Sequence, residues 1–111
     1  MVAPVLLLTT TGRQSQEQRT TPLTFFPDGR DFVVIASYGG GPRHPAWWLN
    51  LRAQPEAEVQ VGPTHHKVTA REAEGDERNR LWRRVTTWMP VYAYYQSRTD
   101  REIPVVVLER N

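Results

Sequence analysis

The chain contains no cysteine and no long apolar run. Disulfide frameworks, thiolate nucleophiles and zinc sites built from cysteine are therefore excluded. Its longest apolar runs, PVLLL and PVVVL, are far shorter than the roughly 20 residues that a membrane-spanning helix needs. The N-terminus shows neither a charged leader region nor a small-residue cleavage site. We therefore expect a soluble, cytoplasmic protein, and its 111 residues suffice for one domain with one core.

The chain also lacks a large excess of positive or negative charge. The 14 basic and 12 acidic residues leave a net charge of +2, and arginine and glutamate alternate along most segments. A nucleic-acid-binding protein is expected to gather its basic residues on one face, with aromatic residues between them. The composition therefore does not indicate nucleic acid as a partner.

The N-terminal region combines a strand, a polar loop and two arginines. Residues 5–11 have the composition of a strand, Gly12 provides a turn, and residues 19–26 are predicted to return as the second strand of a hairpin. Arg13 and Arg19 would then lie close together at one end of a sheet. Planar guanidinium groups suit phosphate or carboxylate ligands. The alternative is a solvated loop with two surface charges.

A glycine-rich loop follows the next strand. Residues 31–37 (DFVVIAS) are predicted to form a strand buried on both faces, and SYGGGPRHP leads from it into a short helix over residues 45–52. Glycines at this place let backbone N–H groups face an anion or a flat ligand, although a flexible connector has the same composition. Trp48 and Leu51 share one helix face, so at least one tryptophan of this helix is expected in the core.

The second half of the chain contains two strands and a longer helix. The strands are predicted over residues 57–61 and 66–74, and the helix over residues 76–89, which Asp76 is expected to cap and Pro90 to end. A group of arginines is expected largely on the helix face opposite the apolar one: Arg78, Arg80, Arg83 and Arg84. A tyrosine-rich segment, predicted as a helical turn plus a loop, leads to a last strand, PVVVLE.

These elements predict an α+β protein of about six strands, mostly joined by hairpins. Six strands of this length cannot leave two long apolar edges exposed. An antiparallel barrel, closed or partly closed, is therefore the expected architecture.

The sequence offers no nucleophile–base pair and no metal-ligand spacing. His65 and His66 point to opposite faces of one strand and His44 stands alone, so we expect structural or surface roles for all three. A concentration of aromatic groups remains, comprising Trp47, Trp48, Trp88, Tyr92, Tyr94 and Tyr95. Together with the glycine loop and the two arginines, these groups suit a planar cofactor with an anionic tail.

Three stretches resemble the deazaflavin-dependent nitroreductase family. They are LLLTTTGRQSQEQRTTPL, DGRDFVVIASYGGGPRHPAWWLNLRAQPEAEVQVG and YQSRTDREIPVVVLER. The resemblance covers about residues 4–109 and implies a split, FMN-binding-like antiparallel β-barrel with two to three flanking helices, as one reductase domain over residues 1–111. It also implies coenzyme F420, an 8-hydroxy-5-deazaflavin, and hydride transfer from its reduced form to quinone, nitroaromatic or related acceptors. An FMN-binding split-barrel protein, a non-catalytic F420 carrier and a barrel interaction domain are the alternatives.

The resemblance also implies site residues by position. Tyr92 is the expected catalytic residue, as a hydrogen-bond or proton donor. The residues expected to bind the cofactor are Arg13, Gln14, Ser15, Arg19, Thr20, Pro22, Ala36, Ser37, Tyr38, Gly39, Gly40, Trp47 and Asn50. Those expected near the acceptor are Ser37, Trp47, Met89, Tyr92 and Tyr95. The family includes monomers and homodimers, and peripheral membrane contact occurs in it, so these properties stay open.

Four positions depart from the usual residues of the family. Gln14 and Tyr38 stand where lysines are common, Gln16 where glycine is common, and Met89 where a tyrosine is common. At about 1.5–3 kcal/mol for each charge-assisted contact, the two absent cations are expected to weaken binding of the cofactor tail by several decades, unless Arg43 or Arg30 compensates.

Overall fold

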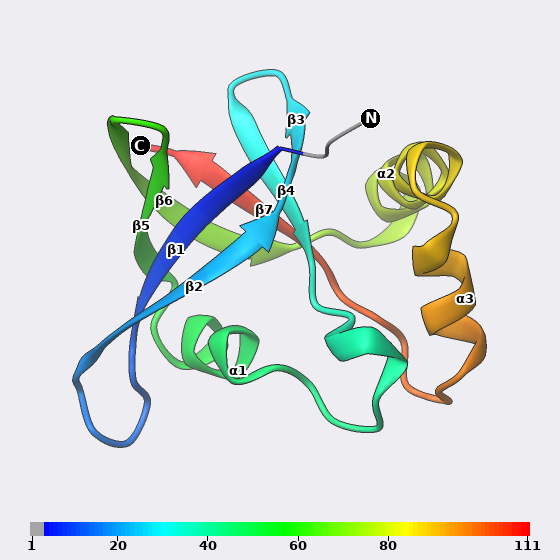
Figure 1. The fold of residues 1–111 in the computed structure, drawn as a ribbon, viewed down its shortest axis with the longest axis horizontal. Helices are drawn as coiled ribbons and strands as arrows, with labels where there is room; N and C mark the ends of the chain where they lie inside the picture. Colours follow the sequence, from blue (N-terminus) through cyan, green and yellow to red (C-terminus); the bar gives the residue numbers. More distant parts are fainter. Residues whose placement is uncertain (1–3) are drawn as a thin grey trace.

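The computed structural model describes residues 4–111, which form one antiparallel sheet curled into a half-barrel with helices beside it (Figure 1). The strands are β1 (Val5–Thr11), β2 (Gln18–Thr24), β3 (Phe26–Asp28), β4 (Asp31–Ile35), β5 (Glu56–Val61), β6 (Thr64–Glu72) and β7 (Val105–Arg110). The helices are the short 3₁₀ turn η1 (Tyr38–Gly40), α1 (Ala46–Ala53), α2 (Gly75–Trp88) and α3 (Val91–Ser97). The predicted α+β split barrel is confirmed, with seven strands in place of about six.

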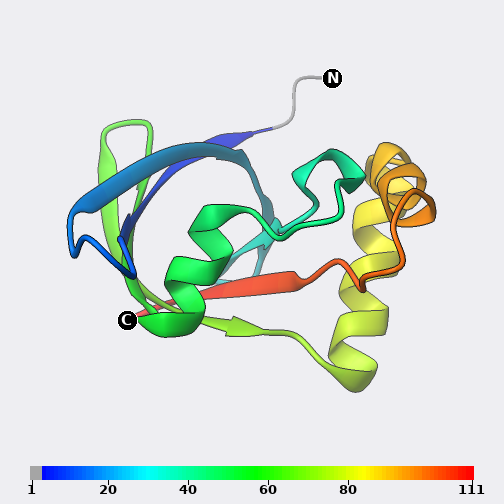
Figure 2. The same ribbon diagram turned by 90° about the horizontal axis from the view of Figure 1, so that it is seen from below.

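The sheet curls so that its two edge strands meet. The strand order is β2-β1-β5-β6-β7-β4-β3, and the edge strands β2 and β3 are separated in the chain by Phe25 alone. The Phe25 N–H donates to the carbonyl of Pro4 at 3.0 Å. Figure 2 shows β2 arching over the barrel toward this corner. The predicted return strand over residues 19–26 was therefore wrong in its length, because the chain passes at Phe25 from one edge of the sheet to the other.

The sheet has a core on each of its faces. Inside the barrel, Val34 packs with Trp47, Trp48 and Leu51 of α1. On the outer face, Val33 of the same strand packs in a second cluster that includes Leu81 and Val85 of α2. The predictions that this strand is buried on both faces and that a tryptophan of α1 is in the core are thus confirmed.

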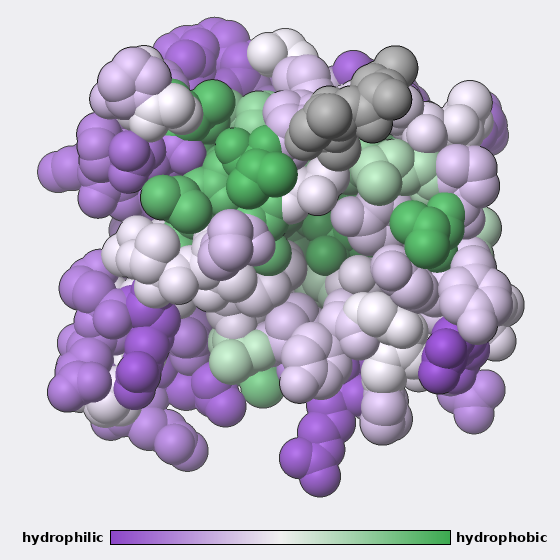
Figure 3. Space-filling view, in the orientation of Figure 1, coloured by the Kyte–Doolittle hydropathy of each residue, from purple (hydrophilic) through white to green (hydrophobic). Residues whose placement is uncertain are grey.

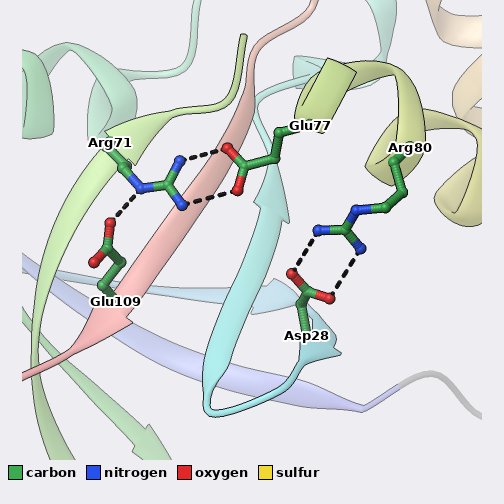
Figure 4. Close-up of polar contacts among 5 residues, drawn as sticks. All are labelled: Asp28, Arg71, Glu77, Arg80 and Glu109. Atoms are coloured by element: carbon green, nitrogen blue, oxygen red, sulfur yellow. Dashed lines mark hydrogen bonds and ion pairs between the residues drawn. The ribbon is translucent and has the colours of Figure 1, made fainter. Parts of the chain in front are cut away.

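Ion pairs attach α2 to the sheet (Figure 4). Arg71 of β6 donates to both oxygens of Glu77 at 2.5 and 2.9 Å and also to Glu109 of β7. Arg80 of α2 donates to both oxygens of Asp28 at 3.2 and 3.1 Å. The hydrogen bond from Arg80 is the largest of the effects that lower the pKa of Asp28, while partial burial opposes it. Bidentate geometry makes these pairs more specific than ordinary surface ion pairs, which contribute little.

The start of α2 differs from the prediction in two respects. Glu74 is the N-cap residue, and Asp76 lies in the first turn, where its charge favours the positive end of the helix dipole. Arg78, expected on the solvent face, has a mostly buried side chain whose Nη1 donates to the carbonyl of Ile103 at 2.7 Å. The second difference arises because α2 packs against the segment that leads into β7.

Part of the outer surface over β1 is apolar. Val5 and Leu7 are 53% and 39% exposed, and Figure 3 shows apolar surface over this strand. Single exposed apolar side chains are ordinary in proteins. Across residues 4–111, none of the helices combines the length and the apolar character needed to cross a bilayer.

Candidate functional site

The loop between β1 and β2 is a compact hydrogen-bonded turn. The Gly12 N–H donates to the carbonyl of Glu17 at 2.7 Å, and the Gln16 N–H donates to the carbonyl of Gly12 at 2.9 Å. Gln16 has a φ of +62°, in the left-handed region that favours glycine. A Cβ on Gly12 would lie 2.6 Å from the hydroxyl of Ser15. The loop therefore has little freedom, and its side chains have defined positions.

Asn50 of α1 holds Arg13 in place. Both the backbone N–H and the Nη1 of Arg13 donate to the Asn50 side-chain oxygen, at 3.2 and 2.9 Å. The amide nitrogen of Asn50 donates to the hydroxyl of Thr10 at 3.3 Å, and Asn50 is only 4% exposed. The amide of Asn50 is thus engaged by the protein itself. Arg19, by contrast, makes a solvent-exposed ion pair with Glu17 at 3.6 Å and is available to a ligand.

Arg101 organises the glycine-rich loop that follows β4. It donates to three backbone carbonyls of this loop: Ala36 at 3.1 Å, Ser37 at 2.6 Å and Gly41 at 3.0 Å. The loop also uses two of its own N–H groups internally, since Gly40 donates to Ser37 and Gly41 donates to Tyr38. These hydrogen bonds favour a defined loop conformation over a flexible connector.

The sequence analysis did not single out Arg101 as a site residue. The segment RTDREIP was recognised only as part of a family resemblance. Nothing in the local pattern indicates that this arginine reaches carbonyls 60–65 residues earlier in the chain. Its position directly before an apolar strand is the one local signal, because a charged side chain there must find polar partners.

His44 accepts a hydrogen bond from Arg101 in its neutral form. Nη1 of Arg101 lies 3.2 Å from Nδ1 of His44, and a guanidinium can only donate, so the ring proton belongs on Nε2. Burial lowers the pKa of His44 below its ordinary value of 6.5, and the charges of Arg101 and Arg52 lower it further. The expected structural role of this histidine is consistent with these contacts.

Replacing His44 with glutamine is expected to reduce the sensitivity of the protein to mild acid. As the pH falls below 6.5, the unfolded chain takes up a proton at this position before the folded protein does, so the free energy of unfolding decreases. Glutamine can still accept from Arg101 but does not titrate. Urea unfolding at about pH 7.5 and about pH 5.5 measures this difference. The exposed His65→Gln variant is the control, and an equal loss of stability in His44→Gln and the unsubstituted protein would contradict the assignment.

Helix α3 brings two tyrosines beside the glycine loop. The rings of Tyr92 and Tyr95 lie 5.9 Å apart in an edge-to-face arrangement. A Cβ on Gly40 would meet the carbonyl oxygen of Tyr95 at 2.7 Å, so the loop and α3 approach each other as closely as backbones allow. Burial raises the pKa of Tyr92, and Tyr95 adds to the shift. The phenol of Tyr92 is therefore protonated throughout the physiological pH range.

Three cavities meet at the start of α1. The polar cavity, about 620 Å³, is bordered by the β1–β2 loop, β2 and α1. The aromatic cavity, about 520 Å³, is bordered by β2, η1 and α3. The arginine cavity, about 610 Å³, is lined by Arg13, Arg43 and Arg101 among others. All three share Ala46, and the first two also share Thr21 and Trp47, so they adjoin one another; together they are named the groove.

The groove brings together most of the predicted site residues. The polar cavity is lined by Arg13, Gln14, Ser15, Arg19, Thr20, Trp47 and Asn50. The aromatic cavity is lined by Pro22, Ser37, Tyr38, Gly39, Trp47, Tyr92 and Tyr95. Three predicted residues line none of the three cavities: Ala36, Gly40 and Met89. Ala36 and Gly40 are buried parts of the loop, and Met89 packs against the outer core.

Within residues 4–111 no three histidine, cysteine or acidic side chains lie close enough to hold a metal ion. The chemistry of the groove therefore depends on its arginines, hydroxyl groups and aromatic rings. Cations at one end and aromatic walls at the other suit a planar molecule with an anionic tail.

A family model described as F420H(2)-dependent quinone reductase matches residues 1–110. The chain belongs to this family. It is 46% identical over 110 residues to the F420H(2)-dependent quinone reductase Rv1261c of Mycobacterium tuberculosis, covering 96% of this chain and 74% of that protein. The predictions of an oxidoreductase and of F420 as its cofactor are confirmed by this membership.

Solved structures agree with the quinone reductase family. An F420-H2 dependent reductase, FDR-A, is 42% identical with a TM-score of 0.86, and the match covers 96% of this chain and 94% of that one. A second structure, described as a domain-swapped dimer, is 41% identical with a TM-score of 0.88, covering 98% and 82% of the two chains. A FAD-binding protein of Mesorhizobium loti, 15% identical with a TM-score of 0.61 over 96% of this chain and 78% of that one, shares the fold alone.

The groove suits F420, the cofactor of the quinone reductase family. The polar and aromatic cavities adjoin at Thr21, Ala46 and Trp47, which suits one elongated ligand that extends from one to the other. Arg13 and Arg19 offer two cations to an anionic tail. The apolar and aromatic walls offer a dry site for a flat ring.

Proposed function

We propose that this protein catalyses hydride transfer from reduced F420 to quinones, with nitroaromatic compounds as further acceptors. The observation that carries the proposal is that the polar cavity, with its two arginines, adjoins the aromatic cavity, with its two tyrosines. When bound, the cofactor supplies the hydride. The part of the protein is to hold donor and acceptor in contact and to exclude water from them.

The β1–β2 loop binds the anionic tail in this proposal. Arg13 and Arg19 contribute charge-assisted hydrogen bonds, and neutral hydrogen bonds come from Gln14, Ser15 and Thr20. Asn50 acts through Arg13, because its side-chain oxygen accepts two hydrogen bonds from that residue. Pre-positioning Arg13 in this way reduces the entropy lost when the tail binds.

The aromatic cavity takes the ring and the acceptor. Trp47 lines both cavities and is buried at the start of α1, so its position beside a bound ring is fixed. Ser37, Tyr38 and Gly39 form the opposite wall. Ala36 and Gly40 contribute through the shape of the loop, and Met89 contributes through the packing of α3 against the outer core.

Tyr92 is the proposed proton donor. A quinone oxygen gains negative charge as the hydride arrives, and a nearby phenol can donate a hydrogen bond or a proton to it. Burial raises the pKa of Tyr92, with a further contribution from Tyr95, so the proton is retained at neutral and mildly alkaline pH. Tyr95 limits the freedom of the Tyr92 ring through their edge-to-face contact.

Replacing Tyr92 with phenylalanine is expected to lower kcat by about a hundredfold while leaving cofactor affinity within about twofold, because a general acid contributes on this scale. Turnover is measured as oxidation of reduced F420 by menadione, and affinity by quenching of tryptophan fluorescence with F420. Tyr94→Phe is the matched control, since Tyr94 lies on the same helix and is 56% exposed. An unchanged kcat in Tyr92→Phe would remove this residue from the mechanism.

The same titration tests the function as a whole when FMN is compared with F420. Preference for F420 together with menadione reduction supports the proposal. A tight F420 complex that reduces neither menadione nor a nitroaromatic compound would identify a carrier instead. Preference for FMN, or binding of neither, would refute the proposed function.

A further inference from the structure

A fourth cavity, here named the basal cavity, lies at the end of the barrel away from α1. Its volume is about 260 Å³. Its walls come from the turn between β3 and β4, from the β5–β6 hairpin and from the end of β7, which meet in the upper part of Figure 1. It shares no lining residue with the three cavities of the groove. Any ligand of the basal cavity is therefore separate from the cofactor and the acceptor.

The basal cavity carries an excess of positive charge. Arg30 and Arg110 line it, and neither of them appears among the ion pairs found in residues 4–111. Asp31 is the one carboxylate in its lining, and it accepts the backbone N–H of Arg110 at 3.4 Å. Asp28, in the neighbouring strand, is already paired with arginines of α2. Two guanidinium groups thus face one carboxylate.

Arg110 also has an unmet hydrogen-bonding requirement. Its Nε is the one buried side-chain nitrogen or oxygen in residues 4–111 that has no hydrogen-bond partner. Leaving a buried charged donor unpaired is costly, so native proteins provide a partner for nearly every such atom. Arg110 lines the basal cavity, and its Nε is enclosed by protein atoms behind that wall.

The other walls of the basal cavity are apolar or aromatic. Phe32 and Val61 line it, and the imidazole of His66 packs on the Phe32 ring at a centroid distance of 5.5 Å. Thr64 adds a hydroxyl group at the rim. A planar carboxylate matches the donor edge of a guanidinium, and an apolar body attached to it would contact the aromatic wall.

We propose that the basal cavity binds a small organic carboxylate. Arg110 takes the carboxylate group through its guanidinium, Arg30 adds the second positive charge, and Phe32 contacts the apolar part of the ligand. The volume of about 260 Å³ accommodates a metabolite of the size of benzoate and not a second F420 molecule.

The test is a titration of the ¹⁵N-labelled protein with benzoate and, separately, with inorganic phosphate, with ionic strength held constant by chloride. Benzoate is expected to cause saturable NMR shifts of the backbone amides of Gly29 and His66. Arg110→Gln and Arg30→Gln are each expected to weaken this binding by about ten- to a hundredfold, the scale of a charge-assisted hydrogen bond. Arg83→Gln, an exposed position on α2, is the matched control and should bind as the unsubstituted protein does.

Several results would overturn the proposal. The first is that benzoate causes no saturable shifts, and the second is that the shifts are confined to the β1–β2 loop. The third is that Arg83→Gln loses as much affinity for benzoate as Arg110→Gln and Arg30→Gln do. Phosphate that binds at least as tightly as benzoate at Gly29 and His66 would overturn the assignment of a carboxylate. If Arg110→Gln does not fold, Arg110→Lys provides the test instead. Lysine keeps the positive charge but lacks the planar guanidinium, so this variant is expected to bind benzoate about tenfold more weakly than the unsubstituted protein does.

Discussion

Replacing Arg101 with methionine is expected to lower the free energy of unfolding by about 2–4 kcal/mol and to weaken F420 binding by at least about tenfold. Three carbonyls of the glycine loop, at Ala36, Ser37 and Gly41, would lose their guanidinium donor together. Because Arg101 is only partly buried, water replaces part of these contacts, and the expected loss is therefore smaller than the sum of three buried charged hydrogen bonds. The loop would lose its fixed shape, and one wall of the aromatic cavity with it.

The matched control for Arg101 is Arg98→Met in the same segment. Arg98 is exposed, and its guanidinium interacts with the ring and the hydroxyl group of Tyr94, so the expected loss in the free energy of unfolding is below about 1 kcal/mol. Urea unfolding and fluorescence titration with F420 measure both effects. Arg101→Lys should recover little of the stability and of the F420 affinity, since an ammonium group lacks the planar fork of donors with which the guanidinium reaches three carbonyls. Equal stability losses at positions 98 and 101 would contradict the role assigned to Arg101.

Replacing Gly40 with alanine is expected to lower the free energy of unfolding by about 2–4 kcal/mol and to reduce kcat for menadione reduction by at least about tenfold. Gly40 has a φ of +79°, which disfavours alanine, and the added Cβ would lie 2.7 Å from the carbonyl oxygen of Tyr95. That atom belongs to the backbone of α3 and cannot rotate away. Relief of the clash therefore requires a shift of α3, which displaces Tyr92 and Tyr95 from the aromatic cavity.

The variant Gly39→Ala separates the cost of placing alanine at a positive φ from the cost of the clash between the added Cβ and α3. Gly39 has a φ of +63°, but a Cβ there would meet nothing within 4 Å. Its expected loss in the free energy of unfolding is about 1 kcal/mol, and the reduction of kcat is expected to be smaller than in Gly40→Ala. If the two variants lost the same stability and the same activity, the close approach of the loop to α3 would not be what positions the tyrosines.

Much of the fold could be predicted from local patterns. The run FVVI, residues 32–35, contains no polar residue, and Val33 and Val34 of β4 are indeed buried on opposite faces of the sheet. The spacing of Leu81 and Val85 predicted the buried face of α2. The break at Phe25 was not predictable in this way, because an apolar aromatic residue continues a strand pattern. It becomes a corner only when the sheet curls and its two edges meet.

The groove was predicted in outline and not in its internal contacts. Arg13 and Arg19 were expected together because a hairpin places them together, and both line the polar cavity. Asn50 was expected beside the cofactor, whereas its side chain is engaged by Arg13 and Thr10. Hydrogen bonds between residues 37–40 positions apart leave no trace in a local pattern.

The sequence by itself determined the strands, the main helices, the absence of thiol chemistry and the family, because apolar periodicity, turn residues and motif spacing are local properties. Only the tertiary structure decided that Arg101 supports the glycine loop, that Gly40 contacts α3, and that Arg110, whose Nε has no hydrogen-bond partner, lines the basal cavity. Each of these facts depends on backbone groups brought together from distant parts of the chain. Such contacts exist only after the barrel has closed and the helices have packed against it.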